Sequence, residues 1–479
     1  MKRRTTDPPL HAPPVREPQV NSLATFLPPS AGGSRARFDT KLGLDNERAT
    51  RLSRRYLRVV SSAERPDRMR ILYLSALFPP DVLGGAEMSA YSQALWLRDQ
   101  GHEVAVLTTA QSAADEVHGQ FVDGLRVYRL HMPRLYPVFR FAAAKAWQKP
   151  LWHVQDHLDP NNRRIAASVL EDFRPDVATL HVVQGLGYNV LTELAARDIP
   201  VVYFLHDLGL ACVKMSMFRN GHECEKQCSI CTVSSWYKES LIRKLRRVGF
   251  CSPSRANLAR VAEFLPIRRY PHAAILNPNR YPKATVARTE SAQLRVLYAG
   301  RIHQTKGVDI LLESARRLQR ARGNARPFHV TVVGTGPQEA ELRREFGAEP
   351  WCTFTGFVNQ AELSNIMLNS DVLCVPSVWF ENSPGVLIQA LGLGLPVLGS
   401  NIGGIPELVE HARNGLVLPA GDVEAWRSAL EGIVQDRERL NGWRSYALAH
   451  SAHFEQDYLG RLTLDFIQTV IGAGSAGGA

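Results

Sequence analysis

The chain has no long stretch of purely apolar residues. A membrane-spanning helix needs about 20 consecutive apolar residues. The longest uncharged apolar run here, Gly385 to Ile402, is interrupted by several glycines, by Pro396 and by polar residues. This run therefore predicts a helix, a turn and a strand. Basic residues stand at the N-terminus but no apolar segment follows them, so the sequence does not predict a signal peptide.

Cysteine is scarce, with 7 residues irregularly placed in a chain of 479. A disulfide framework is typical of short secreted domains rich in cysteine, so none is expected here. The length is sufficient for two or three domains with sizeable cores. The sequence therefore predicts a reduced, cytoplasmic protein.

The positive charge is concentrated at the N-terminus. Residues 1–70 hold 15 of the 57 Lys and Arg and 7 of the 46 Asp and Glu, so this part carries +8 of the net +11. The remainder is nearly neutral, and nucleic-acid binding by the whole protein is not expected. Residues 1–68, rich in Pro, Arg and Ser, are predicted to be a mostly disordered arm. Either the arm is a basic tether to an anionic membrane surface or a partner, or translation begins at Met69 and the arm is not made.

From Arg70 onward, short β-rich runs alternate with helical patterns, which predicts an α/β fold with parallel strands. We expect an N-terminal domain over 69–275, a linker over 276–292, a C-terminal domain over 293–450, and a last helix and tail over 451–479. In the first domain, Gly84 and Gly85 follow a predicted strand and precede a helix predicted from Met88. Two glycines let backbone N–H groups approach an anion closely.

Two segments of the first domain have more than one interpretation. Tyr136 to His157 is rich in aromatic residues and lysine, and predicts either an amphipathic helix at a membrane interface or a helix packed on the domain. Within the insertion 212–231, four cysteines predict either a structural zinc site or unliganded thiols in a loop: Cys212, Cys224, Cys228 and Cys231. Their spacing also matches a radical SAM cluster motif, but a position in the middle of a domain argues against that chemistry.

The second domain carries two clusters of polar residues at predicted strand ends. Arg301 and Lys306 follow one strand, and Glu381 follows the strand predicted over 371–377. After Glu381, Pro384 stands where a first helical turn tolerates proline, and Ser383 can cap the helix. A helix N-terminus is a common receptor for phosphate.

This ordered series of motifs, over roughly 69–470, resembles the retaining glycosyltransferases of family 4. The resemblance implies the GT-B fold, in which two Rossmann-like domains face each other across a cleft and the C-terminal helix crosses back to the first domain. It also implies that Arg301 and Lys306 stabilise a departing diphosphate, and that Glu381 and His206 hold the donor sugar. The family has a second Glu where this chain has Gln389, which puts the affinity for the nucleotide ribose in doubt.

The resemblance implies a larger set of donor-binding residues along the cleft. These are Gly84, Gly85, Gly334, Gly336, Phe357, Val358, Asn382, Ser383, Pro384, Gly385, Val386 and Gln389.

The expected reaction moves a sugar from a nucleotide diphosphate to a hydroxyl acceptor with retention of configuration. A glycan, a lipid-linked sugar or a glycoconjugate is the expected acceptor, and cell-envelope polysaccharide biosynthesis the expected setting. No cofactor or divalent metal should be required, because cations and a helix dipole can take the metal's place. Location in the cytoplasm, with peripheral contact at the inner face of the membrane, is expected. Two alternatives remain: an inert GT-B partner subunit, or another GT-B enzyme such as a nucleotide-sugar epimerase.

Overall fold

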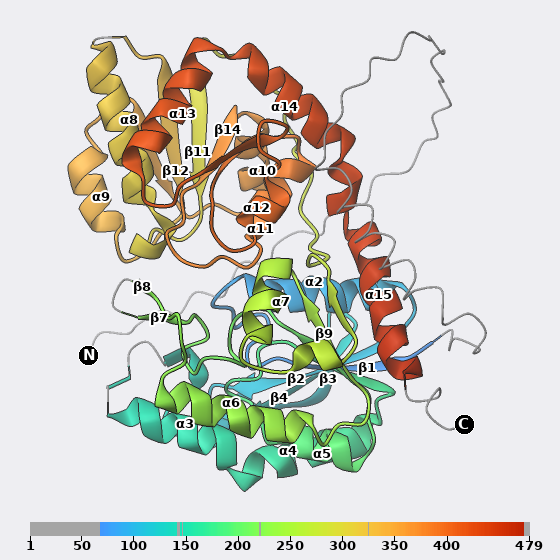
Figure 1. Cartoon of the computed structure of the whole chain (residues 1–479). Helices are drawn as coiled ribbons and strands as arrows, with labels where there is room; N and C mark the ends of the chain where they lie inside the picture. Colours follow the sequence, from blue (N-terminus) through green and yellow to red (C-terminus); the bar gives the residue numbers. More distant parts are fainter. Residues whose placement is uncertain (1–67, 141–143, 146, 220–221, 324, 474–479) are drawn as a thin grey trace, which may run out of the picture. The chain divides into compact units, whose positions relative to one another are not determined.

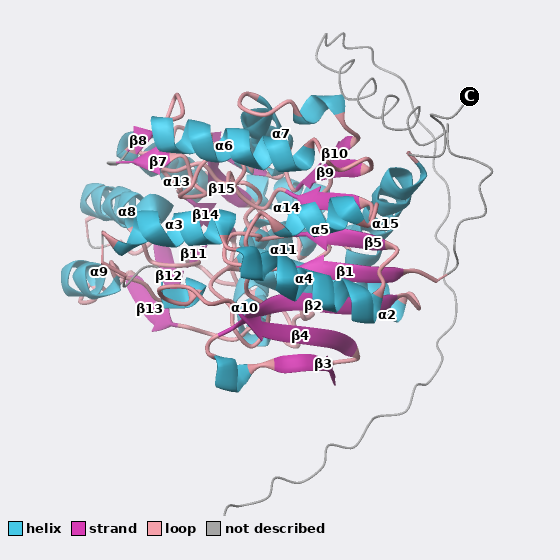
Figure 2. Ribbon diagram, turned by 90° about the horizontal axis from the view of Figure 1, so that it is seen from below, coloured by secondary structure: helices cyan, strands magenta, loops and turns pink. Residues whose placement is uncertain are grey.

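The computed structural model describes residues 68–140, 144–145, 147–219, 222–323 and 325–473. The predicted N-terminal arm lies outside these residues except for Arg68, as does most of the C-terminal tail. The described elements belong to one compact unit of the chain, Val60–Ala479. They form two sheets with helices on both faces (Figures 1 and 2).

The first sheet has 8 strands in the order β10-β9-β6-β5-β1-β2-β4-β3, which Figure 2 shows in the same succession. Its strands are β1 (Arg70–Leu74), β2 (Glu103–Ala110), β3 (Val117–Val122), β4 (Leu125–His131), β5 (Val177–Leu180), β6 (Val201–Phe204), β9 (Val248–Ser252) and β10 (His272–Ala274). The prediction of parallel strands is correct except at the edge, where β3 pairs antiparallel with β4. The sequence did not predict β3, because its largely exposed side chains form no apolar run.

Side chains of β1 alternate between two cores, as successive residues of a strand must. Ile71 and Tyr73 pack into a core with α2 and α15, whereas Leu72 and Leu74 face a core shared by the helices α4 to α7. Helices on both faces explain why these strands are apolar throughout. The helices of this half are α2 (Gly85–Asp99), α3 (Gln148–Leu158), α4 (Pro160–Phe173), α5 (Val190–Ala196), α6 (Ser229–Ile242) and α7 (Arg255–Ala262).

The second sheet has 6 strands, all parallel, in the order β13-β12-β11-β14-β15-β16. Its strands are β11 (Leu294–Ala299), β12 (Phe328–Val333), β13 (Cys352–Gly356), β14 (Val372–Val375), β15 (Val397–Ser400) and β16 (Gly415–Leu418). Val296 faces the core formed with α8, α9 and α13, and Leu297 faces the core formed with α10 and α11. The helices are α8 (Val308–Arg322), α9 (Glu339–Phe346), α10 (Gln360–Leu368), α11 (Gly385–Gly392), α12 (Ile405–Leu408), α13 (Val423–Gln435) and α14 (Glu438–Ala449).

The last helix, α15 (Gln456–Gly472), packs on the first half of the chain, as the resemblance implied. Phe466, Ile467 and Val470 are buried in the core formed with β1 and α2. At the start of the helix, Trp96 Nε1 donates a hydrogen bond to Asp457 Oδ1 at 2.8 Å. Among the described residues, no helix has the length and apolar character needed to cross a membrane.

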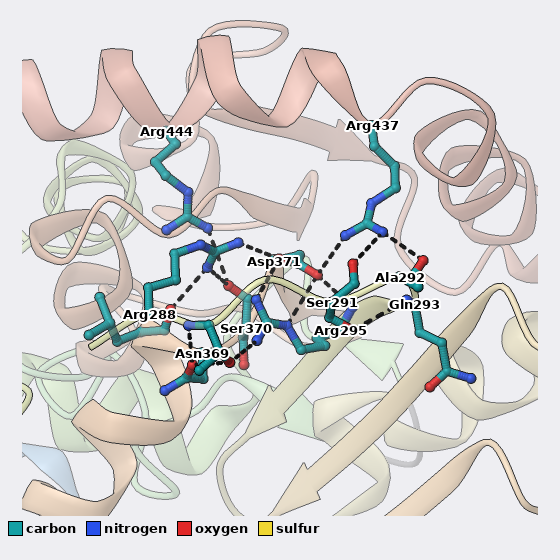
Figure 3. Close-up of polar contacts among 12 residues, drawn as sticks. Arg288, Ser291, Ala292, Gln293, Arg295, Asn369, Ser370, Asp371, Arg437 and Arg444 are labelled. Carbon is teal, nitrogen blue, oxygen red and sulfur yellow. Dashed lines mark hydrogen bonds and ion pairs between the residues drawn. The ribbon is translucent and has the colours of Figure 1, made fainter. Parts of the chain in front are cut away.

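A cluster of arginines joins the linker and α14 to the second sheet (Figure 3). Arg288, Arg295 and Arg437 all form ion pairs with Asp371, which precedes β14 and is 2% exposed. The guanidinium of Arg288 also donates to Ser370 O at 2.6 Å. This carboxylate therefore connects the linker, β11 and α14 at the amino-terminal end of the central strands.

Candidate active site

A cleft of about 770 Å³ is lined by residues from both halves of the chain. His206 lies just beyond β6, Arg301 just beyond β11, and Glu381 in the loop that follows β14. The carboxyl ends of parallel strands are where open α/β sheets bind ligands. The structure therefore brings together the catalytic residues predicted from both domains, with Lys306 completing the lining.

Lys306 reaches Glu381 because Gly307 allows two loops to approach closely. Gly307 has φ +64°, and a Cβ at this position would lie 2.0 Å from Pro376 O. Only glycine adopts this conformation without strain and leaves room for the carbonyl. Lys306 is thereby held against the end of β14, where the loop with Glu381 begins.

One oxygen of Glu381 accepts three hydrogen bonds. Oε1 lies 2.5 Å from Lys306 Nζ and 2.7 Å from Ser377 Oγ. Trp379 Nε1 donates to the same oxygen at 3.0 Å, and the Lys306 ammonium lies 5.0 Å from the centroid of the Trp379 ring. In the described part of the chain Oε2 has no hydrogen-bond partner, so one carboxylate oxygen remains available to a ligand.

Two further polar groups at the cleft have no partner among the described residues. The Arg301 side chain is exposed and its guanidinium forms no ion pair or hydrogen bond with them. Ser383 Oγ is buried and unpaired, and Pro384 rather than Ser383 precedes the first residue of α11. The predicted capping role of Ser383 is therefore wrong. A buried hydroxyl without a partner is costly, so this atom is well placed to bind a ligand.

His206 is held by a second histidine. Its Nε2 lies 2.8 Å from His181 Nδ1, and the His181 ring stacks on Tyr73 and Phe204. Burial lowers the pKa of His206 to about 4, so the imidazole is neutral near pH 7. The next residue, Asp207, also lines the cleft, and burial raises the pKa of its carboxyl group to about 6.

Asn382 joins the two halves of the chain. Its Oδ1 accepts a hydrogen bond from Ser254 Oγ at 2.6 Å, and its Nδ2 donates to Leu205 O at 2.8 Å and to His206 O at 3.0 Å. Asn382 lines the cleft, as predicted, but its side chain positions the loop that carries His206. Nothing in the sequence indicated this contact, because the partners are more than 120 residues away.

The glycine pair of the first domain lies at a helix start. Helix α2 begins at Gly85, three residues before the predicted Met88, and Glu87 Oε2 accepts a hydrogen bond from Gly84 N at 3.0 Å. A Cβ at Gly85 would meet no atom within 4 Å. Both glycines line the cleft, so the N-terminus of α2 lies at its wall.

Five predicted donor-binding residues are absent from the cleft lining: Gly334, Gly336, Phe357, Val358 and Gln389. A Cβ at Gly334 would lie 2.0 Å from Gly300 O, so this glycine lets one loop pack on another. The Phe357 side chain is 80% exposed. Gln389 is buried and donates a hydrogen bond from Nε2 to Ser364 Oγ at 3.0 Å. Their roles in binding the donor remain predictions.

The predicted zinc site is not supported. Cys231 Sγ lies 3.8 Å from Cys212 Sγ, and this hydrogen bond lowers the pKa of Cys212. Cys224 is half-buried and Cys228 is exposed. No three Cys, His, Asp or Glu side chains converge to hold a metal ion in the part of the chain that the structure describes. The thiols of Cys212 and Cys231 instead pair with each other near the buried face of α6.

The insertion that carries these cysteines contributes to the cleft. It forms a hairpin of β7 (Phe218–Arg219) and β8 (His222–Glu223). The ring of Phe218 meets that of Trp379 edge to face, with centroids 6.5 Å apart, and Met215 lines the cleft beside it. No pattern in the sequence predicts this contact, because it depends on the packing of an insertion against a distant loop.

Two sequence-family models match the chain. "Glycosyl transferase 4-like domain" matches residues 84–277 and "Glycosyl transferases group 1" matches residues 293–436.

The amylovoran biosynthesis glycosyltransferase AmsK of Erwinia amylovora is 32% identical over 30% of this chain and 36% of its own length. The putative colanic acid biosynthesis glycosyltransferase WcaL of Salmonella typhimurium is 26% identical over 47% of this chain and 54% of its own length. These two alignments thus span about a third to a half of the relatives. A glycogen synthase of Mycobacterium tuberculosis is 26% identical over 77% of this chain and 86% of its own length.

Solved structures share the fold. Anabaena HepE, solved in complex with UDP, has a TM-score of 0.60 at 18% identity and covers 83% of this chain and 98% of its own. Sucrose-phosphate synthase from Thermosynechococcus elongatus has a TM-score of 0.64 at 16% identity, covering 85% of this chain and 100% of its own. With two Rossmann-like halves and both family matches in chain order, the chain belongs to the group 1, or family 4, glycosyltransferases of the GT-B fold.

Proposed function

We propose that the protein transfers a sugar from a nucleotide diphosphate to a hydroxyl group of an acceptor, with retention of the anomeric configuration. The observation that supports this most is the convergence of Arg301, Lys306 and Glu381 in one cleft. A departing nucleoside diphosphate gains negative charge as the sugar bond breaks. Preorganised cations placed where charge develops often supply the largest part of catalysis.

The two cations have different roles in this proposal. The Arg301 guanidinium, free of protein partners among the described residues, can bind two phosphate oxygens at once. Lys306 is already paired with Glu381, so its position is fixed before the donor binds. The N-termini of α2 and α11, at the cleft-lining residues Gly85 and Gly385, add a favourable field for the phosphates.

Glu381 and His206 would hold the sugar. Oε2 of Glu381 can accept a hydrogen bond from a sugar hydroxyl, while Oε1 is fixed by its three donors. His206 is neutral, and its Nδ1 has no hydrogen bond among the described residues. A neutral imidazole held at Nε2 offers a single positioned contact to the sugar without competing for the phosphates.

For the acceptor, we propose a glycan, a lipid-linked sugar or a glycoconjugate. AmsK and WcaL carry names that refer to the biosynthesis of amylovoran and colanic acid. Uridine is a reasonable first base for the donor, since HepE was also solved with UDP-glucose. We therefore propose a role in polysaccharide biosynthesis.

The first test is calorimetric binding of a panel of nucleoside diphosphates and nucleotide sugars. We expect saturable binding of one nucleotide class by the wild type and loss of that binding in the Arg301→Ala, Lys306→Ala double variant. The matched control is Arg320→Ala, which removes an exposed cation near the other end of α8. Binding that survives in the double variant would place the donor elsewhere, and no binding by any nucleotide would contradict the proposal.

Turnover separates the proposed transferase from its two alternatives. A transferase releases the nucleoside diphosphate and forms a glycoside, whose anomeric coupling in proton NMR reports retention or inversion. An epimerase would convert the nucleotide sugar without an acceptor. An inert partner subunit would bind the nucleotide sugar and leave it unchanged over long incubation.

A further inference from the structure

The outer surface of two helices in the first half is apolar. On α3 and the residue before it, exposed residues recur at helical spacing, so they share one side of the helix: Trp147 (62% exposed), Leu151 (51%), Val154 (56%) and Leu158 (59%). On α6, three exposed apolar residues also recur at helical spacing: Ile230 (66% exposed), Val233 (65%) and Trp236 (69%). We call these seven residues the α3–α6 face. Soluble proteins rarely leave an apolar surface of this size uncovered.

The two helices are neighbours, so their exposed residues belong to one surface. His157 Nε2 of α3 lies 2.9 Å from Ser234 Oγ of α6, and Tyr237 OH donates to His157 O at 2.8 Å. Figures 1 and 2 both show α3 and α6 side by side. His157 and Ser234 are buried between the helices, which leaves Val154, Leu158 and Val233 on the outer side of the contact.

The sequence predicted this surface only in part. Trp152, which lies in the segment from Tyr136 to His157, is fully buried, and its Nε1 donates to Tyr136 O at 2.9 Å. The segment is thus both a helix packed on the domain and an exposed apolar surface. The contribution of α6 was not predicted, because its apolar residues alternate with Ser, Thr and Cys.

The charges around the α3–α6 face are mostly positive. Exposed or half-buried cations flank it at Arg140, Lys145, Lys149, Lys226 and Lys244. The carboxylate of α3, Asp156, is buried and paired with Arg134, and Glu239 of α6 is paired with Arg243. Two exposed acids, Glu223 and Glu225, stand at the hairpin end of α6. Apolar side chains surrounded by Lys and Arg fit an anionic lipid surface better than a second, equally basic copy of the chain.

The α3–α6 face also reaches the cleft. Ile230 is the second residue of α6, and a short loop joins this helix to the hairpin whose Phe218 contacts Trp379. Met215 and Ser216, a few residues before the hairpin, line the cleft. A molecule held in a bilayer under this face would therefore lie close to one edge of the cleft.

We propose that the α3–α6 face docks on an anionic lipid bilayer, with Trp147 and Trp236 inserted at the level of the lipid headgroups. Tryptophan favours this level because its ring is apolar and its N–H is polar. Docking of this kind would present a lipid-linked acceptor to the cleft, a consequence that rests on the proposed function. The docking itself does not depend on transfer and is measured without any sugar.

The test is co-sedimentation of the full chain with phosphatidylcholine vesicles and with vesicles containing equal amounts of phosphatidylcholine and phosphatidylglycerol. We expect binding to the anionic vesicles only, and a loss of roughly tenfold or more in the Leu151→Gln, Val154→Gln, Trp236→Gln variant. The matched control is Phe121→Gln on the edge strand β3, which removes a similarly exposed aromatic residue (72%) outside the α3–α6 face. We expect this control to bind as the wild type does.

Tryptophan fluorescence separates this surface from the basic N-terminus. Residues 1–67 contain no tryptophan, so vesicle binding through them alone leaves the fluorescence unchanged. Quenching by brominated lipids, diminished in Trp147→Phe and in Trp236→Phe, supports the proposal. Three results would each overturn the proposal. They are vesicle binding by the triple variant equal to that of the wild type, no quenching by brominated lipids, and a dimer in light scattering that dissociates in the triple variant. Calorimetric donor binding by the same triple variant is expected to match the wild type, so failure here is distinct from failure of the proposed function.

Discussion

Lys306 and Glu381 form an ion pair, with Nζ 2.5 Å from Oε1, although 75 positions separate them in the sequence. Their side chains are 26% and 10% exposed, so the pair lies at the wall of the cleft rather than on open surface. In the proposed function, this pair joins the acid that would hold the sugar to a cation that would stabilise the phosphates. The two residues should therefore act as one unit in transfer.

A double-mutant cycle tests this coupling. We expect Lys306→Ala and Glu381→Ala each to lower kcat/KM by roughly a hundredfold, as removal of a charge-stabilising group does. The double variant should lose much less than the product of the two, because each single change already breaks the pair. The control cycle is Arg322→Ala with Glu431→Ala, an ion pair of 3.2 Å outside the cleft lining. Losses that multiply in the first cycle would show that Lys306 and Glu381 act independently.

Gln389 provides a test of ribose binding. Its Nε2 donates to Ser364 Oγ, and its Oε1 has no hydrogen bond among the described residues. Although Gln389 is buried and absent from the cleft lining, the resemblance to family 4 implies that this side chain binds a ribose hydroxyl. We expect Gln389→Leu to raise the donor KM roughly fivefold with kcat unchanged, the effect of one neutral hydrogen bond. Ser364→Ala removes the orienting contact, together with the hydrogen bond from Ser364 Oγ to Pro282 O, and should change the donor KM less. An unchanged KM in Gln389→Leu would exclude the ribose contact.

Asp371 should stabilise the second half at neutral pH. Burial alone would raise the pKa of Asp371, but the guanidinium and the backbone N–H of Arg295, with the charge of Arg288, hold it below its usual range. We expect Asp371→Asn to lower the free energy of unfolding by about 3 kcal/mol at pH 7, since three arginines lose their carboxylate (Figure 3).

The pH dependence of this difference follows from the sign of the shift. A carboxyl group whose pKa is lower in the folded state stabilises the fold above its unfolded pKa of about 3.9. The difference between wild type and Asp371→Asn should thus be constant from neutral pH to about pH 5, and should shrink as the pH falls below about 4. Urea denaturation at several pH values measures it. A difference that grows on acidification would contradict the assigned shift.

The sequence was sufficient for the fold and for most of the cleft. Strands such as β1 and β14 are buried on both faces, so they appear as apolar runs bounded by turn residues. Arg301, Lys306, Glu381 and His206, which the resemblance to family 4 singled out, line one cleft because the carboxyl ends of parallel strands converge. The features that the sequence did not predict depend on contacts between segments that are far apart in the chain.

Three particular errors show this limit. The antiparallel edge strand β3 has no apolar pattern to detect. Ser383 was expected to cap α11, but Pro384 precedes the helix and Ser383 Oγ has no partner among the described residues. Four cysteines at metal-like spacing suggested zinc, but spacing along the chain does not fix the direction of side chains on a helix and a hairpin.

Gly404 supports the acid loop by close packing. A Cβ at this position would lie 1.9 Å from Asn382 O. We expect Gly404→Ala to displace the loop of Glu381 and Asn382, with a loss of about 2 kcal/mol or more in the free energy of unfolding and weaker donor binding. In contrast, Gly442→Ala in α14, where a Cβ meets no atom within 4 Å, should stabilise the protein by about 0.5–1 kcal/mol. Equal effects of the two substitutions on urea denaturation would contradict the packing argument.

His206 should make the free energy of unfolding depend on pH between about 6.5 and about 4, which is above the range in which Asp371 does so. Its pKa falls from about 6.5 in the unfolded chain to about 4 in the fold because of burial, so the unfolded chain binds more protons between these values. Stability is therefore lost as the pH falls from about 6.5 to about 4. His206→Gln, neutral throughout, should reduce this loss by up to about 3 kcal/mol in urea denaturation at each pH.

His157, whose pKa burial also lowers to about 4, serves as the comparison. His157→Gln should flatten the dependence of stability on pH similarly, while only His206→Gln should lower transfer activity. If both variants lower activity equally, the effect of His206 is one of folding and not of contact with the sugar.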